Sequence, residues 1–173
     1  MRAIPSSNLL AFSSSREPSL PNFSLISAAH WGFLAQPAPQ PEREIGRDPL
    51  SYFDGLMALW SGTKSLDVFD PRALEAYRQG CNEPNRIHAF CEDYRAGATL
   101  DRAQDEDDLL AKKRIGCPVH LIYSSRYLVR PGTEDPLQPW RETFAPPIGG
   151  TALDCGHFVA EERPAETLAA LQA

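Results

Sequence analysis

Apolar residues recur at helical spacing through the middle of the chain, and each stretch opens with a polar residue just before a proline. The three openings are Asp48-Pro49, Asp70-Pro71 and Asn82-Glu83-Pro84. A side-chain oxygen at such a position caps the first turn, and proline fits the first helical residue. A fourth periodic stretch runs from about residue 100 to 113, and a shorter one begins near residue 29. The pattern predicts an all-helical block over residues 29–114, with a Pro-rich, charged connector at 37–47.

The pattern changes after residue 114. Two short apolar runs, Cys117–Tyr123 and Ile148–Leu153, suit buried parallel strands. A helix is expected between them, at about residues 135–144, and another at Pro164–Leu171. Strand, helix, strand, helix is typical of a doubly wound parallel sheet. Because two parallel strands need neighbours for their edges, the sequence indicates part of a larger α/β domain.

Composition excludes several classes of protein. The formal net charge of −6 and the lack of a basic stretch argue against a nucleic-acid-binding protein. No apolar run is long enough to cross a membrane. The cysteines show no zinc-ligand spacing, so we expect no metal, no cofactor and a reducing compartment. The first 16 residues contain arginine and serine but no acid, which leaves organelle targeting as an alternative to a cytoplasmic location.

The candidate catalytic residue, His157, lies near the C-terminus. A short apolar stretch ends at Leu153, Gly156 turns the backbone and His157 follows, just before a helix. In open α/β sheets, binding and catalytic residues lie on such loops, at the C-terminal ends of the strands. The position of His157 therefore predicts a hydrolase. The sequence contains no G-x-D-x-G or G-x-S-x-G nucleophile elbow.

Three segments in order resemble the fluoroacetate (haloacetate) dehalogenase type of α/β-hydrolase, whose nearest relatives are epoxide hydrolases. They are His30–Pro39 (HWGFLAQPAP), Cys91–Ala98 (CEDYRAGA) and Ala152–Phe158 (ALDCGHF). The resemblance covers about residues 29–172. It implies a partial α/β-hydrolase fold of class α/β, with a helical cap followed by the last two strands and helices of the doubly wound sheet.

The same resemblance implies roles for four residues. In such enzymes an aspartate displaces the halide and forms an ester, which a histidine-activated water then hydrolyses. His157 matches this catalytic general base. His30, Trp31 and Tyr94 match the halide- and substrate-binding donors, which stabilise the charge on the departing halide. The orienting carboxylate has no match, although Glu134 and Asp135 follow the penultimate strand, where other α/β-hydrolases place it.

The resemblance also sets the expected organisation. Residues 1–28 are predicted to be a divergent, disordered segment, 29–114 a helical cap domain, and 115–173 the C-terminal part of the hydrolase core. The predicted function is hydrolysis of a small haloacid through an aspartyl ester, in a chain that lacks the nucleophile segment and is inactive as it stands. The alternatives are an epoxide hydrolase-like enzyme and a non-catalytic, truncated remnant or interaction module. A homodimer is possible by family resemblance, and no nucleic-acid or membrane partner is expected.

Overall fold

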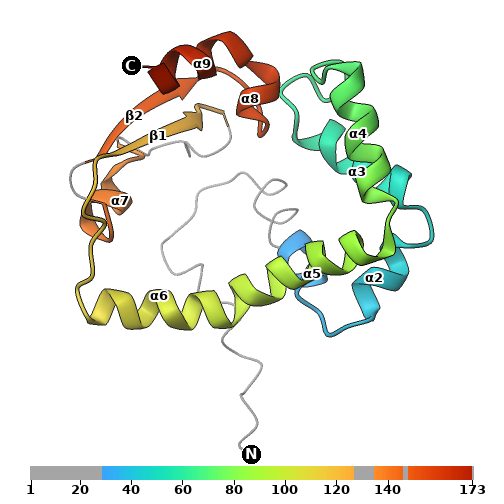
Figure 1. Ribbon diagram of the computed structural model, residues 1–173, viewed down its shortest axis with the longest axis horizontal. Coiled ribbons are helices and arrows are strands. Elements are labelled where there is room, and N and C mark those ends of the chain that lie inside the picture. The colour runs from blue at the N-terminus through green and yellow to red at the C-terminus, as the bar shows by residue number, and fades with distance from the viewer. Residues whose placement is uncertain (1–28, 127–134, 146–147, 173) are drawn as a thin grey trace, which may run out of the picture. The chain divides into compact units, whose positions relative to one another are not determined.

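The computed structural model describes residues 29–126, 135–145 and 148–172 (Figure 1). The segment predicted to be disordered, 1–28, lies outside these residues. The described residues fall into two units, one ending at Phe33 and the other beginning at Leu34. In the first unit, residues 29–33 are helical.

The second unit begins with helices and continues with strands that alternate with helices, as the sequence predicts. The helices are α2 (Gln40–Ile45), α3 (Pro49–Trp60), α4 (Pro71–Cys81), α5 (Pro84–Ala98), α6 (Leu100–Leu110), α7 (Gln138–Glu142), α8 (Val159–Glu162) and α9 (Pro164–Gln172). The strands are β1 (Val119–Ser124) and β2 (Ile148–Leu153).

Side-chain caps are confirmed at two of the three predicted helix starts, whereas α5 begins at Pro84 as predicted but has no side-chain cap. Asp48 accepts a bond from the amide of Ser51 at 3.1 Å and so caps α3. Asp70 caps α4 in the same way, through the amide of Arg72 at 2.8 Å. These caps supply acceptors for amides that have no partner within their own helix. Local sequence therefore determines where these two helices begin.

The connector predicted at residues 37–47 is wrong in part, because α2 occupies Gln40–Ile45. Pro41 lies in its first turn, where the missing amide hydrogen costs nothing. Ile45 and Pro41 are buried, and α2 packs against α5. Packing of one short apolar face stabilises a helix whose proline-rich sequence reads locally as a loop.

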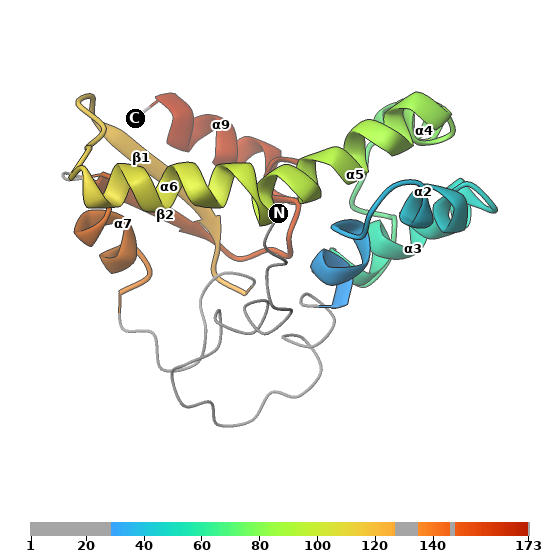
Figure 2. The ribbon, with the colours of Figure 1, turned by 90° about the horizontal axis from the view of Figure 1, so that it is seen from below.

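The two strands pair in parallel, with Val119 opposite Ile148 and Ser124 opposite Leu153 (Figure 2). Helix α9 packs against β2, and α8 against β1. In the part of the chain that the structure describes, the sheet has these two strands alone. The parallel register places the C-terminal ends of both strands at one edge, and the loop after β2 leaves from that edge.

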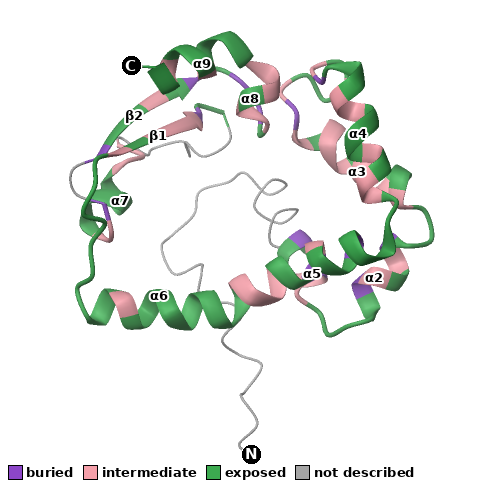
Figure 3. Ribbon diagram, viewed as in Figure 1, coloured by how far each residue is buried: buried purple, intermediate pink, exposed green. Residues whose placement is uncertain are grey.

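Burial is uneven along the chain (Figure 3). Completely buried side chains cluster in the helical region, where Leu34, Ile45 and Cys91 are less than 2% exposed. Helices α3, α4, α6 and α9 contain no buried residue, and Leu110 at the end of α6 is 82% exposed. The described helices contain none that is long and apolar enough to span a membrane.

Candidate active site

His157 lies on the five-residue loop between β2 and α8, at the C-terminal edge of the sheet. Two bonds hold the start of this loop. The buried hydroxyl of Ser124, the last residue of β1, donates to the carbonyl of Cys155 at 2.7 Å, and the amide of Ser125 donates to the carbonyl of Leu153 at 2.9 Å. The predicted position of the histidine, just beyond a parallel strand, is what the structure shows.

The loop also meets the last residue of α3 and the segment that follows this helix. The amide of His157 donates to the carbonyl of Trp60 at 2.9 Å. Gly156 passes so close to Gly62 that a Cβ at position 156 would lie 2.2 Å from the amide nitrogen of Gly62. Side chains do not tolerate contacts this short, so this crossing requires glycine. In the sequence, Gly62 follows a helical stretch, and no local pattern marks it as a contact of the loop of His157.

One carboxylate joins both segments. Glu162, at the end of α8, accepts hydrogen bonds from the amides of Gly62 at 2.9 Å, Gly156 at 2.8 Å and Phe158 at 3.2 Å. In the sequence, Glu162 is one of two adjacent acidic residues, Glu161 and Glu162, before Pro164. Its distance of 100 residues from Gly62 left no local signal for this contact.

The imidazole of His157 packs between aromatic rings. The centroid of the Trp60 ring lies 5.3 Å away and that of Phe158 5.0 Å away, both edge to face. His157 is an exposed residue, yet the rings packed against its imidazole exclude part of the solvent. This desolvation lowers the pKa of the imidazole, and the negative charge of Glu162 opposes that change. A lowered pKa keeps the ring neutral near pH 7, the state in which it can accept a proton from water.

Tyr94, the third predicted donor, lies half-buried on α5 in a row of aromatic rings. Its ring is 5.2 Å from Phe90, which is 5.2 Å from Phe53, which is in turn 5.2 Å from Tyr52. Burial raises the pKa of Tyr52 to about 12, and the proximity of Tyr94 adds to this effect. Tyr52 thus keeps its hydroxyl proton at all physiological pH values. The proximity of Tyr52 to Tyr94 has no local signal in the sequence, because the two residues lie on different helices, α3 and α5.

His30 and Trp31 lie in the unit that ends at Phe33. His30 is buried, whereas Trp31 is 50% exposed. Their grouping with Tyr94 and His157 stays a prediction.

Of the two candidate orienting carboxylates, Glu134 lies outside the described residues. Asp135 accepts a bond from the amide of Leu137 at 2.9 Å and forms an ion pair with Arg141, which lowers the pKa of Asp135. These contacts assign its carboxylate a local role at the start of α7.

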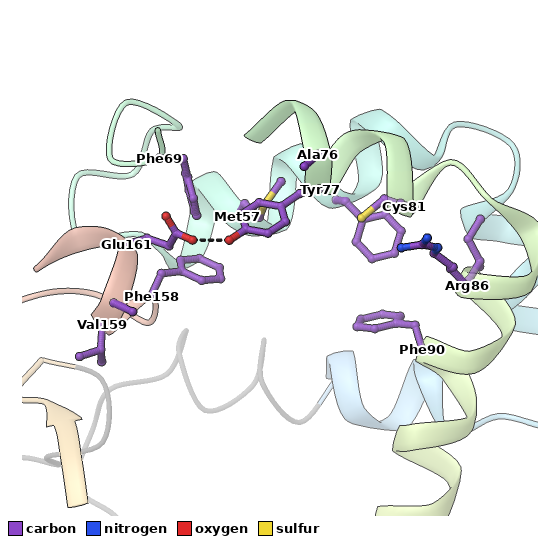
Figure 4. A pocket seen from close by; sticks show the side chains of 14 residues that line it. Met57, Phe69, Ala76, Tyr77, Cys81, Arg86, Phe90, Phe158, Val159 and Glu161 are labelled. Atoms are coloured by element: carbon purple, nitrogen blue, oxygen red, sulfur yellow. Dashed lines mark hydrogen bonds between the residues drawn. The ribbon is translucent and has the colours of Figure 1, made fainter. Parts of the chain in front are cut away.

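A separate apolar pocket of about 620 Å³ lies between α3, α4, α5 and the start of α8 (Figure 4). Phe53, Phe69, Phe90 and Phe158 line it, and the hydroxyl of Tyr77 donates to Glu161 at its wall. Neither His157 nor Tyr94 is among the lining residues. The pocket therefore adjoins the loop of His157 without containing its imidazole.

A group of three possible metal ligands, Glu42, His88 and Glu92, lies on the helical surface. The guanidinium of Arg95 already contacts both carboxylates, at 2.8 Å from Glu42 and 2.5 Å from Glu92. Its hydrogen bonds lower the pKa of Glu42 to about 2. This cluster has the contacts of a structural ion-pair network.

Comparison with known proteins agrees with this architecture. No protein-family model matches the chain. A fluoroacetate dehalogenase from Burkholderia sp is 38% identical over 141 residues, which are 80% of this chain and 44% of that protein. A provisionally named α/β-hydrolase from Nostoc sp PCC 7120 is 40% identical with a TM-score of 0.75, covering 84% of this chain and 48% of its own. A provisionally named epoxide hydrolase from Pseudomonas aeruginosa is 32% identical with a TM-score of 0.79, covering 95% and 52%.

A helical region followed by parallel strands and their helices, with a histidine loop at the strand ends, is part of an α/β-hydrolase. The chain belongs to that superfamily and, within it, to the group that resembles fluoroacetate dehalogenase and the epoxide hydrolases. It spans about half the length of the relatives it matches.

Proposed function

We propose that this chain carries the water-activating part of a haloacid hydrolase, with His157 as the general base. In the first step of such a reaction, a carboxylate oxygen attacks the substrate carbon, the carbon–halogen bond breaks and halide leaves. In the second step, the base takes a proton from water, whose oxygen attacks the carbonyl carbon of the enzyme ester and releases the hydroxy acid. A neutral imidazole can act in the second step, because it can accept the proton from water.

The position of His157 carries this proposal. Its loop leaves the C-terminal edge of the parallel strands, its backbone is bonded to Trp60, and desolvation lowers the pKa of its ring. The likeness to the Burkholderia fluoroacetate dehalogenase supports a small haloacid as the substrate class. In the proposed site, His30, Trp31 and Tyr94 donate hydrogen bonds to the departing halide.

A chimaera tests the proposal, because the sequence of this chain contains no nucleophile elbow. The matched stretch of the Burkholderia fluoroacetate dehalogenase is replaced by the corresponding residues of this chain, and halide release from fluoroacetate and chloroacetate is measured. We expect turnover by the chimaera. With His157→Asn the ester should accumulate after a single turnover, and mass spectrometry should detect it on the protein. His88→Asn, on the exposed face of α5, is the matched control and should leave turnover intact.

Two results would contradict the proposal: a folded chimaera that releases no halide, or His157→Asn turning over at the unmodified rate. The purified 173-residue chain is assayed in parallel, and we expect no halide release from it alone. If the 173-residue chain does release halide and His157→Asn abolishes this release, a carboxylate outside any nucleophile elbow attacks the substrate.

The pair Tyr52 and Tyr94 favours a second candidate, an epoxide hydrolase-like reaction. Two protonated phenols near each other can both donate to an epoxide oxygen as its ring opens. In the chimaera, Tyr52→Phe and Tyr94→Phe distinguish the two reactions. A dehalogenase should lose halide release with Tyr94→Phe and keep it with Tyr52→Phe, whereas opening of styrene oxide should fall with either substitution.

A further inference from the structure

The carboxylate of Glu162 occupies an unusual position for a residue at the end of a four-residue helix. It accepts three backbone amides at 2.8–3.2 Å, two from the loop of His157 and one from the segment after α3. A charged acceptor makes stronger hydrogen bonds than a neutral one. The side chain is half-buried, so water competes less for these amides than it would at an open surface.

The backbone around this carboxylate is closed by two further contacts. The close crossing of Gly62 and Gly156 brings their amides to the same oxygen, Oε2 of Glu162. His157, one residue after Gly156, donates its amide to the carbonyl of Trp60, two residues before Gly62, and the rings of His157 and Trp60 are in contact. The imidazole thus lies directly beside the junction that the carboxylate closes.

We propose that Glu162 is a positioning residue, whose carboxylate locks the loop of His157 onto the segment after α3 and so holds the imidazole against Trp60. The inference rests on the proposed role of His157 as the base, and it adds the group whose hydrogen bonds to the backbone orient the loop. Without the carboxylate, three amide donors lose their acceptor, and the link through Glu162 between Gly62 and the loop of His157 is lost.

The neighbouring Glu161 is a matched control. It has the same charge and lies on the same short helix, but its carboxylate accepts from the hydroxyl of Tyr77 instead of from backbone amides. A general effect of negative charge or of helix stability would appear with either residue. An effect of the hydrogen bonds from the three backbone amides to the carboxylate would appear with Glu162 alone.

The test uses nuclear magnetic resonance of the 173-residue chain and needs no turnover. Glu162→Gln and Glu161→Gln are compared with the unmodified protein, with His157→Gln to assign the imidazole signal. With Glu162→Gln, we expect the His157 pKa to fall because a nearby negative charge is removed, the amides of residues 62, 156 and 158 to exchange faster, and the contacts between His157 and Trp60 to weaken. With Glu161→Gln, all three should stay unchanged.

The unmodified chain provides a second measurement in case Glu162→Gln does not fold. In hydrogen exchange, the amides of Gly62, Gly156 and Phe158 should be protected to a similar extent, because one carboxylate binds all three and its release exposes them together. Unprotected amides, or three unrelated degrees of protection, would overturn the proposal. It would equally be overturned if folded Glu162→Gln kept the His157 titration and the contacts with Trp60. Neither measurement depends on halide release, so the result is separate from that of the chimaera.

Discussion

The helical region and the two-stranded sheet differ in how far each completes its own interactions. Helices α2 and α5 pack together and bury Ile45, Ile87 and Cys91, and α3 and α4 are joined by an ion pair of Arg78 with Asp54 at 2.7 Å. In β1 the only buried residue is Ser124, and in β2 only the two terminal residues, Ile148 and Leu153, are buried. Runs of this composition are usually covered on both faces.

This difference shows that apolar composition alone does not bury a strand. A helix satisfies its backbone internally and needs one partner for its apolar stripe, whereas a parallel strand needs neighbours at both edges and layers on both faces. In the strand-containing region, the closest backbone packing is therefore in the loop after β2, where Gly156 crosses Gly62 of the segment after α3. The following predictions test this contrast, in order of expected effect.

Disruption of the glycine crossing should have the largest effect. Gly156→Ala places a methyl group 2.2 Å from the amide nitrogen of Gly62, so backbone must move, and we expect a loss of about 3 kcal/mol in the free energy of unfolding. Gly55→Ala, in α3, meets nothing within 4 Å and should instead gain about 0.5–1 kcal/mol through helix propensity. Urea unfolding followed by circular dichroism measures both. Equal stability of the two variants would show that the crossing is not a constraint.

Loss of the ion pair between Glu42 and Arg95 should have an intermediate effect, confined to the helical region. Both side chains are only 14% exposed, so we expect Glu42→Gln to cost about 1–2 kcal/mol at pH 7. The exposed pair of Glu44 and Arg47 is the control, and Glu44→Gln should cost about 0.5 kcal/mol or less.

The pH dependence of this ion pair has a defined direction. Because the pKa of Glu42 falls from 4.5 to about 2 in the folded protein, its contribution is complete above the ordinary value and disappears as the pH falls through about 2. The difference in stability between the unmodified chain and Glu42→Gln should therefore shrink between these two values. A constant difference down to pH 2 would contradict the assignment.

Removal of a helix cap should have the smallest effect. Asp70→Ala takes away the acceptor for the first amides of α4, and the melting temperature should fall by a few degrees. Asp67→Ala, an exposed residue of the same loop, should leave the melting temperature unchanged. If the two variants melt at the same temperature, the cap contributes nothing to this helix.

The sequence alone determined the features whose causes are local. Caps followed by proline determined where α3 and α4 begin, and the short apolar run at Ile148–Leu153 marked β2. The same local reading placed His157 on the loop beyond that strand. Each of these features depends on residues a few positions apart, so it can be predicted without the contacts that the rest of the fold provides.

Tertiary structure alone decided the contacts that join distant segments. Helix α2 forms within a proline-rich stretch because α5 covers its apolar face, and Tyr52 meets Tyr94 because α3 and α5 both contribute to one row of aromatic rings. The bond between Glu162 and Gly62 spans 100 residues. A single sequence reports which groups are present, but hydrogen bonds and packing at such separations depend on where the folded backbone brings them.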